Sequence, residues 1–118
     1  MIDPQSCIQG INTNSLRTTQ APYGLSFILS GSLPYFDGHF PAQPILPAVA
    51  VLDLSLEFLK IILSKSDLEF TKISSAKFYN IIQPNDKIDV QMVCSERSKW
   101  EIRWLVEDKK VADLVVNV

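Results

Sequence analysis

The sequence predicts an α+β domain in which one long, buried helix packs on a curved antiparallel sheet. The longest apolar segment, residues 48–63, carries its charged residues on one helical stripe, as a largely buried helix does. Apolar and polar residues then alternate in several short segments, and one such segment also precedes the helix. A chain of 118 residues is large enough for one core, so we expect a single domain over residues 1–118.

The helix is predicted over residues 47–63. It starts at Pro47, because proline is favoured at the first helical position. Asp53, Glu57 and Lys60 follow one helical stripe, and Glu57 and Lys60 have the spacing of an i, i+3 ion pair. Nearly all other positions are apolar, so we expect other parts of the chain to cover the helix on most of its circumference.

Strands are predicted on both sides of the helix. A turn at residues 21–24 is followed by a strand over 25–33. After the helix we expect strands within 70–82, centred on 76–79, and over 87–94, 99–106 and 111–118, with turns at 83–86, 95–98 and 107–110. Trp100 and Trp104 share one face of their strand and are expected in the core or an interface, and Cys94 is expected to be buried.

Composition argues against several classes of function. The net charge is −2 and no basic patch is visible, so we expect no nucleic-acid partner. Charged residues interrupt the apolar helix, so we expect no membrane span. The first residues lack the pattern of a signal peptide, and we expect a cytoplasmic protein. One histidine and two widely spaced cysteines predict no metal site, and we expect no cofactor.

The segment before the helix holds the chain's only histidine, His39. Residues 34–47 contain four prolines, which exclude regular structure and stiffen the chain. An imidazole titrates near neutral pH, and a helix start offers free backbone N–H groups, so the two together could form a reactive site. By pattern alone, however, His39 fits a structural loop histidine and Asp53 fits a solvated helix stripe.

At Gly38-His39-Phe40-Pro41 the sequence resembles the 3-hydroxyacyl-(acyl carrier protein) dehydratases of the hotdog fold. Pro44-Ile45-Leu46-Pro47-Ala48-Val49 then fills the family's second motif, and Asp53 stands fourteen positions after His39, as the family's acid does. Residues 76–79 and 84–86 look like the family's Lys-Phe strand and its Pro-Gly-Asp turn. The resemblance covers about residues 25–118. In its short N-terminal part the chain is similar to the small dehydratase-like proteins of aryl polyene pathways.

The resemblance implies a hotdog fold and a set of site residues. His39 would be the base that takes a proton from C2, and Asp53 would protonate the leaving hydroxyl group. The N–H groups of Ala48 and Val49 would stabilise charge on the thioester oxygen. The motif residues Gly38 and Phe40 would contact the substrate, with Phe40 screening the site from water.

The implied substrate is a 3-hydroxyacyl thioester carried by acyl carrier protein or coenzyme A. Its product would be the trans-2-enoyl thioester of fatty-acid or polyene-type biosynthesis. The implied assembly is a homodimer or larger, in which His39 of one subunit faces Asp53 of the other. Two alternatives stay open: a hotdog thioesterase that uses Asp53 to drive water, and a non-catalytic acyl-binding domain. Ala48 favours the second alternative, because the family usually has glycine there.

Overall fold

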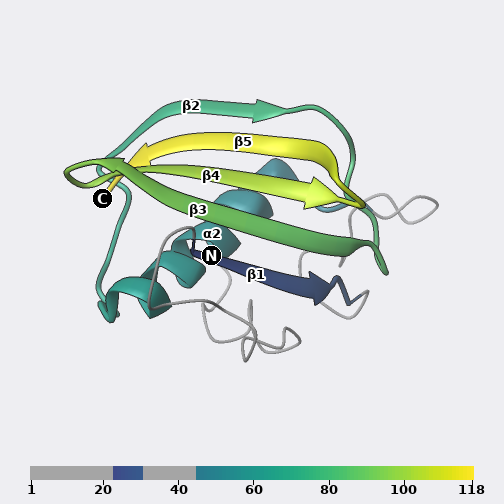
Figure 1. Cartoon of the computed structure of the whole chain (residues 1–118), viewed down its shortest axis with the longest axis horizontal. Coiled ribbons are helices and arrows are strands. Elements are labelled where there is room, and N and C mark those ends of the chain that lie inside the picture. Colours follow the sequence, from purple (N-terminus) through teal and green to yellow (C-terminus); the bar gives the residue numbers. More distant parts are fainter. Residues whose placement is uncertain (1–22, 31–44) are drawn as a thin grey trace.

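A computed structural model describes residues 23–30 and 45–118 of the chain. Within them, five antiparallel strands form one sheet in the order β1-β3-β4-β5-β2, and a single helix lies against one face of it (Figure 1). The elements are β1 (Tyr23–Ile28), α2 (Ala48–Leu63), β2 (Lys72–Phe78), β3 (Lys87–Glu96), β4 (Lys99–Val106) and β5 (Lys109–Asn117). This arrangement confirms the expected hotdog architecture, with one strand before the helix and four after it.

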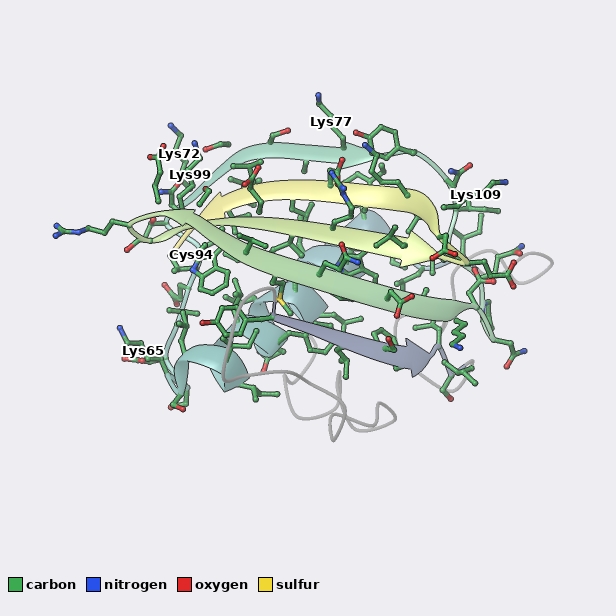
Figure 2. All side chains as sticks on the ribbon, viewed as in Figure 1. Lys65, Lys72, Lys77, Cys94, Lys99 and Lys109 are labelled. Carbon is green, nitrogen blue, oxygen red and sulfur yellow. The ribbon has the colours of Figure 1, made fainter. Side chains whose placement is uncertain are left out.

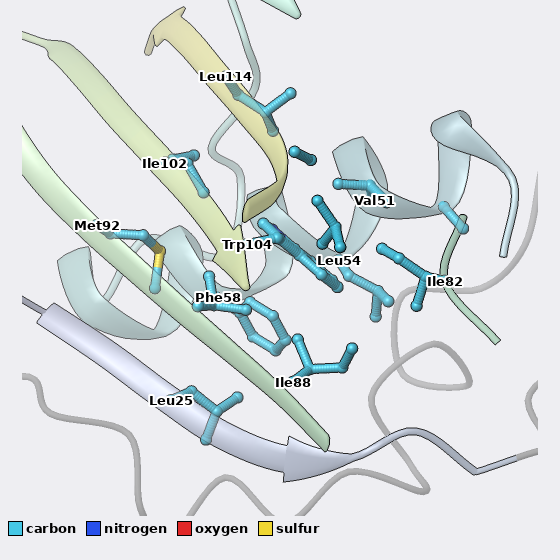
Figure 3. Packing of buried hydrophobic residues seen from close by; sticks show 14 of the residues in the cluster. Leu25, Val51, Leu54, Phe58, Ile82, Ile88, Met92, Ile102, Trp104 and Leu114 are labelled. Carbon is cyan, nitrogen blue, oxygen red and sulfur yellow. The ribbon is translucent and has the colours of Figure 1, made fainter. Parts of the chain in front are cut away.

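The core lies between α2 and the face of the sheet that it covers (Figure 3). Alternation along β3 and β4 puts every second side chain on this face, as the pleat of a strand requires. Trp100 and Trp104 are only 4% and 0% exposed, so their predicted place in the core is confirmed. Phe58 of α2 packs against Trp104 with the ring centroids 6.2 Å apart.

The helix begins one residue later than predicted. Pro47 has an extended backbone (φ −70°, ψ 155°) and is the residue before the helix, so Ala48 is its first residue. The predicted pair of Glu57 and Lys60 is confirmed, with Oε1 and Nζ 2.9 Å apart.

Complete burial is confined to one face of α2. Partial burial extends further around the helix, as expected, since only Ala48, Val49 and Ile61 among its residues are exposed. The fully buried residues of the helix are Ala50, Val51, Leu54, Ser55, Phe58 and Leu59. By contrast, Val49 is 58% exposed and Ile61 is 37% exposed. The side of this apolar helix that carries Val49, with the partly exposed Leu52, Asp53 and Leu56, is therefore the more accessible one in the single chain.

The predicted bounds of two strands, β1 and β2, are wrong. β1 starts at Tyr23, inside the predicted turn, and ends at Ile28 rather than at residue 33. It ends early because the next residue, Leu29, exchanges backbone hydrogen bonds with the turn at residues 83–86 instead of continuing along β3. β2 ends at Phe78, so the predicted strand centre lies at its end and Tyr79 lies beyond it.

The prediction that Cys94 is buried is wrong. β3 runs on to Glu96, with a register shift against β4 between Cys94 and Glu96, and every residue from Val93 to Glu96 is exposed. The Cys94 thiol is exposed, and its Sγ lies 2.9 Å from the Glu96 carbonyl oxygen. Within the described residues, no helix has both the length and the apolar character that crossing a membrane requires.

Candidate active site

The start of α2 presents backbone donors at an exposed position. The N–H groups of Ala50 and Val51 donate to the Pro47 carbonyl oxygen at 3.0 and 3.4 Å, so hydrogen bonding within the helix begins there. Among residues 23–30 and 45–118, the N–H groups of Ala48 and Val49 have no backbone acceptor, as the first turn of a helix leaves them. Both residues are exposed.

Asp53 lies on the same helix, one turn after Val49. Residues four apart on a helix are neighbours on one face, so the Asp53 carboxylate shares the accessible side of α2 with Val49. Its side chain is half-buried, in contrast to the fully buried Leu54 that follows it. The structure thus brings together three of the six predicted site residues: the two N–H donors and the acid.

The other three predicted residues, Gly38, His39 and Phe40, lie outside the described residues. The predicted pairing of His39 with Asp53 therefore stays a prediction. Leu46, which follows that segment, is held next to the start of α2, because its N–H donates to the Ile82 carbonyl oxygen at 2.8 Å. Ile82 belongs to the connection from β2 to β3, at the end of the sheet that carries Lys109 (Figure 2).

A buried hydrogen bond fixes α2 to the sheet beneath the candidate site. The Trp104 indole Nε1–H donates to Ser55 Oγ at 2.9 Å, and both residues are fully buried. The sequence contains a signal for this bond, because Ser55 is the polar residue that falls on the otherwise apolar side of the helix. Since Ser55 is two residues from Asp53, the bond also fixes the rotation of the helix that carries the acid.

The opposite face of the sheet carries a separate charged cluster centred on Asp113. Arg103 Nε and Lys110 Nζ each lie 3.0 Å from its carboxylate, and the Tyr79 hydroxyl donates to it at 3.2 Å. Partial burial opposes ionisation, but the hydrogen bonds and charges of Arg103 and Lys110 outweigh it, so the pKa of Asp113 is lowered. This cluster borders a hollow of about 380 Å³ between β2, β3, β4 and β5.

The edge strand β2 exposes apolar side chains. Among the strands that the structure describes, β2 pairs only with β5 and lies at the end of the sheet order. Ile73 and Phe78 are 46% and 42% exposed, and Tyr79 and Ile81 just beyond the strand are 46% and 54% exposed.

No group of three or more His, Cys, Asp or Glu side chains within residues 23–30 and 45–118 could hold a metal ion.

Comparison with known proteins gives a family-model match over most of the chain. Residues 15–115 match the model described as ApeI-like, ApeI dehydratase. The chain is 27% identical over 103 residues to the 3-hydroxyacyl-(acyl-carrier-protein) dehydratase FabZ of Rickettsia massiliae, covering 81% of this chain and 61% of that protein. It is 29% identical over 90 residues to FabZ of Cupriavidus taiwanensis, covering 67% and 60%. The chain therefore spans about three fifths of the length of these relatives.

Solved structures share the fold. The dehydratase heterocomplex ApeI:P from Xenorhabdus doucetiae matches with a TM-score of 0.75 at 22% identity, covering 86% of this chain and 90% of that one. An uncharacterized protein from Erwinia carotovora subsp. atroseptica matches with a TM-score of 0.71, also at 22% identity, covering 88% and 89%. At this level of identity the two structures support the architecture alone.

Proposed function

The chain belongs to the ApeI-like dehydratase family, and we propose that it eliminates water from a 3-hydroxyacyl thioester to give the trans-2-enoyl thioester. One observation carries the proposal beyond family membership. The N–H groups of the exposed residues Ala48 and Val49 and the Asp53 side chain lie within two helical turns at the start of one helix. Oxyanion donors and an acid in one place are what this elimination needs.

Each predicted residue has a defined part in the reaction. His39 accepts the proton from C2, and the electron pair of that C–H bond forms the C2=C3 double bond. Asp53, in its protonated carboxylic acid form, gives a proton to the C3 hydroxyl group, which leaves as water when the C3–O bond breaks, and Asp53 is left as the carboxylate. The N–H groups of Ala48 and Val49 donate to the thioester oxygen, where negative charge builds up as the C2 proton leaves. Gly38 and Phe40 flank His39, and Phe40 limits access of water.

The substrate is proposed to be carried by acyl carrier protein or by coenzyme A. The FabZ relatives are named for a substrate on acyl carrier protein, which favours that carrier. The accessible side of α2 also suits an acyl chain. Besides Asp53 it presents the exposed Val49 and the partly exposed Leu52 and Leu56, which give the chain an apolar surface beside the reacting groups.

We propose that the active assembly is a homodimer, or a larger oligomer built from dimers, with His39 and Asp53 of one site supplied by different subunits. The exposed edge of β2 supports a dimer. An unpaired strand edge that carries exposed apolar side chains such as Ile73 and Phe78 is a place where a second chain pairs. Pairing there would extend the sheet and bury these side chains.

The experiment is a dehydration assay on purified protein with a 3-hydroxyacyl thioester, following the 2-enoyl product by absorbance. We expect His39→Ala and Asp53→Asn each to lower kcat by about 10²–10⁴-fold, the usual contribution of a general acid or base. Glu57→Gln is the matched control, because Glu57 is the next carboxylate on the helix and bonds to Lys60. We expect it to leave kcat unchanged.

The outcomes separate the alternatives. Release of free thiol without enoyl product would identify a thioesterase. Thioester binding without turnover would identify a non-catalytic acyl-binding domain. If wild-type protein forms the enoyl product and His39→Ala does so at the same rate, His39 is not the base. If Asp53→Asn and Glu57→Gln lower kcat equally, the negative charge of the helix, rather than a proton donor at position 53, determines the rate.

A further inference from the structure

Two cross-strand rows of side chains line the hollow on the outer face of the sheet, which is the face opposite α2 (Figure 1). In one row, Lys77 of β2 and Arg103 of β4 both pair with Asp113 of β5. In the next row, Glu101 of β4 pairs with Val115 of β5. Side chains alternate between the two faces along a strand, so residues two apart on β4 and on β5 share this face.

The side chains of Lys77 and Glu101 carry charges that the rest of the described chain does not compensate. Asp113 is paired with Arg103 and Lys110, whose nitrogen atoms each lie 3.0 Å from its carboxylate. Among the residues that the structure describes, neither Lys77 nor Glu101 makes an ion pair or a side-chain hydrogen bond. Both are exposed, and Lys77 extends from β2 away from the sheet (Figure 2). The hollow therefore holds one unpaired positive charge and one unpaired negative charge.

Apolar side chains flank the Glu101 carboxylate on both neighbouring strands. Val93 of β3 and Val115 of β5 are the residues that pair with Glu101. Val93 is 39% exposed and Val115 is partly exposed. A surface that covered the two valines would remove apolar area from water, which favours association. It would also exclude water from an ion pair made with Glu101, which strengthens that pair.

The two unpaired charges are arranged in a self-complementary way. Lys77 and Glu101 lie on strands separated by β5, so their positions are about 10 Å apart across the strands. A two-fold axis in the plane of the outer face, at a right angle to the line between them and through its midpoint, exchanges the two positions. One such rotation therefore places Lys77 of each copy against Glu101 of the other, and forms two ion pairs in a single symmetric contact.

We propose that the outer face of the sheet is a contact surface for a second copy of this chain, in which Lys77 and Glu101 form these two reciprocal ion pairs around the exposed valines. The inference rests on the dimer proposed at the edge of β2. Pairing at that edge continues the sheet, so the edge dimer presents two outer faces on the same side.

Two edge dimers can therefore meet through two of these contacts at once. The second contact forms within an assembly that is already joined, at a high effective concentration, so the two together hold more tightly than either alone. A single contact is too weak to join two monomers, because exposed ion pairs each contribute little. The resulting assembly has four chains.

The test is the number of chains in the assembly, measured by size-exclusion chromatography with multi-angle light scattering. Lys77→Glu and Glu101→Lys each place like charges against one another at all four ion pairs of a four-chain assembly. We expect each to weaken the association of edge dimers about 10²-fold and to leave particles of two chains. The double variant Lys77→Glu/Glu101→Lys restores opposite charges, and we expect it to form four chains again.

Lys65→Glu and Glu69→Lys are the matched controls for the two charge reversals. Both residues are exposed between α2 and β2, outside the residues that line the hollow. We expect each control to keep four chains, because its change of net charge equals that of the corresponding test variant while the outer face is untouched.

The outcomes are distinct. A monomeric wild-type protein, a wild-type assembly that neither single reversal changes, or a double variant that does not regain the wild-type mass would overturn the proposal. The measurement needs no turnover. If the wild-type protein is inactive on thioesters but the double variant regains four chains, the outer-face contact stands and the proposed reaction falls. If two-chain wild-type particles become monomers in Lys77→Glu and re-form in the double variant, the outer-face contact stands and the dimer at the edge of β2 falls.

Discussion

The buried hydrogen bond between Trp104 and Ser55 makes a quantitative prediction about stability. Ser55→Ala removes the acceptor and leaves the Trp104 Nε1–H, which is fully buried, without that partner. Stranding a buried donor costs about 1–3 kcal/mol, more than the net contribution of an average hydrogen bond. For 118 residues the entropy of unfolding is about 0.25 kcal/mol/K, so we expect Tm to fall by about 4–12 °C.

Urea denaturation followed by tryptophan fluorescence measures this change. All variants need one protomer concentration, because association makes apparent stability depend on concentration. Trp104→Phe keeps Trp100 as the fluorescent probe and leaves the Ser55 hydroxyl without its donor. We expect the double variant Ser55→Ala/Trp104→Phe to lose less free energy of unfolding than the two single variants lose together, because it removes both partners of one bond.

Ser95→Ala is the control for the loss of a serine hydroxyl. Ser95 Oγ donates to the Lys99 carbonyl oxygen at 3.5 Å on the exposed surface. An exposed substitution of this kind changes the free energy of unfolding by no more than about 0.5 kcal/mol. The reasoning fails if Ser55→Ala is as mild as Ser95→Ala, or if the two losses in the double-mutant cycle simply add.

Three further predictions follow from the helix start, the sheet edge and the charged cluster. Ala48→Pro deletes one N–H donor at the first helical position, where proline is favoured. We therefore expect an unchanged Tm in a thermal melt and a kcat that is about 10²–10³-fold lower. An unchanged kcat would mean that this N–H does not stabilise the thioester oxygen. Phe78→Asp places a charge on the exposed edge of β2, and size-exclusion chromatography should show monomers that fold but do not turn over; an intact dimer would place the interface elsewhere. The lowered pKa of Asp113 means that its ion pairs stabilise the fold above the unfolded-state pKa of about 3.9, and that this stability is lost as pH falls through the lower folded-state pKa. Asp113→Asn should therefore be about 0.2–1 kcal/mol less stable than wild type at pH 7 in urea titrations, with the gap closing below about pH 4; a gap independent of pH would contradict this account.

Local patterns in the sequence predict the elements of this fold well. The helix was predictable because a sixteen-residue apolar run with one polar stripe fits no strand. β4 was placed correctly because residues 99–104 alternate between polar and apolar, and charged residues follow Val106. Asp53, Ala48 and Val49 could be assigned to the start of the helix for the same reason.

What the sequence did not predict depends on contacts between distant residues. β1 ends early because Leu29 bonds to Asn85 and Asp86, and backbone bonds across so large a separation leave no mark in the local pattern. Cys94 follows the alternation of β3 and pairs with Trp100, yet it lies in the exposed end of that strand. Likewise, a Pro-Asn-Asp turn can be recognised from sequence, but not that the Ile82 carbonyl oxygen just before it accepts a hydrogen bond from the Leu46 N–H.

The order of strands β3, β4 and β5 also bears on how the chain folds. These neighbours in sequence are neighbours in the sheet, joined by turns with positive φ at Ser98, Glu107 and Asp108, so their contacts close only short loops. β1 and β2 join the sheet through long-range pairings, which form more slowly. We expect native-state hydrogen exchange to be slowest in β4 and faster in β1. The sheet centre would then persist while the proposed site residues, which all precede it in the chain, open and re-form around it.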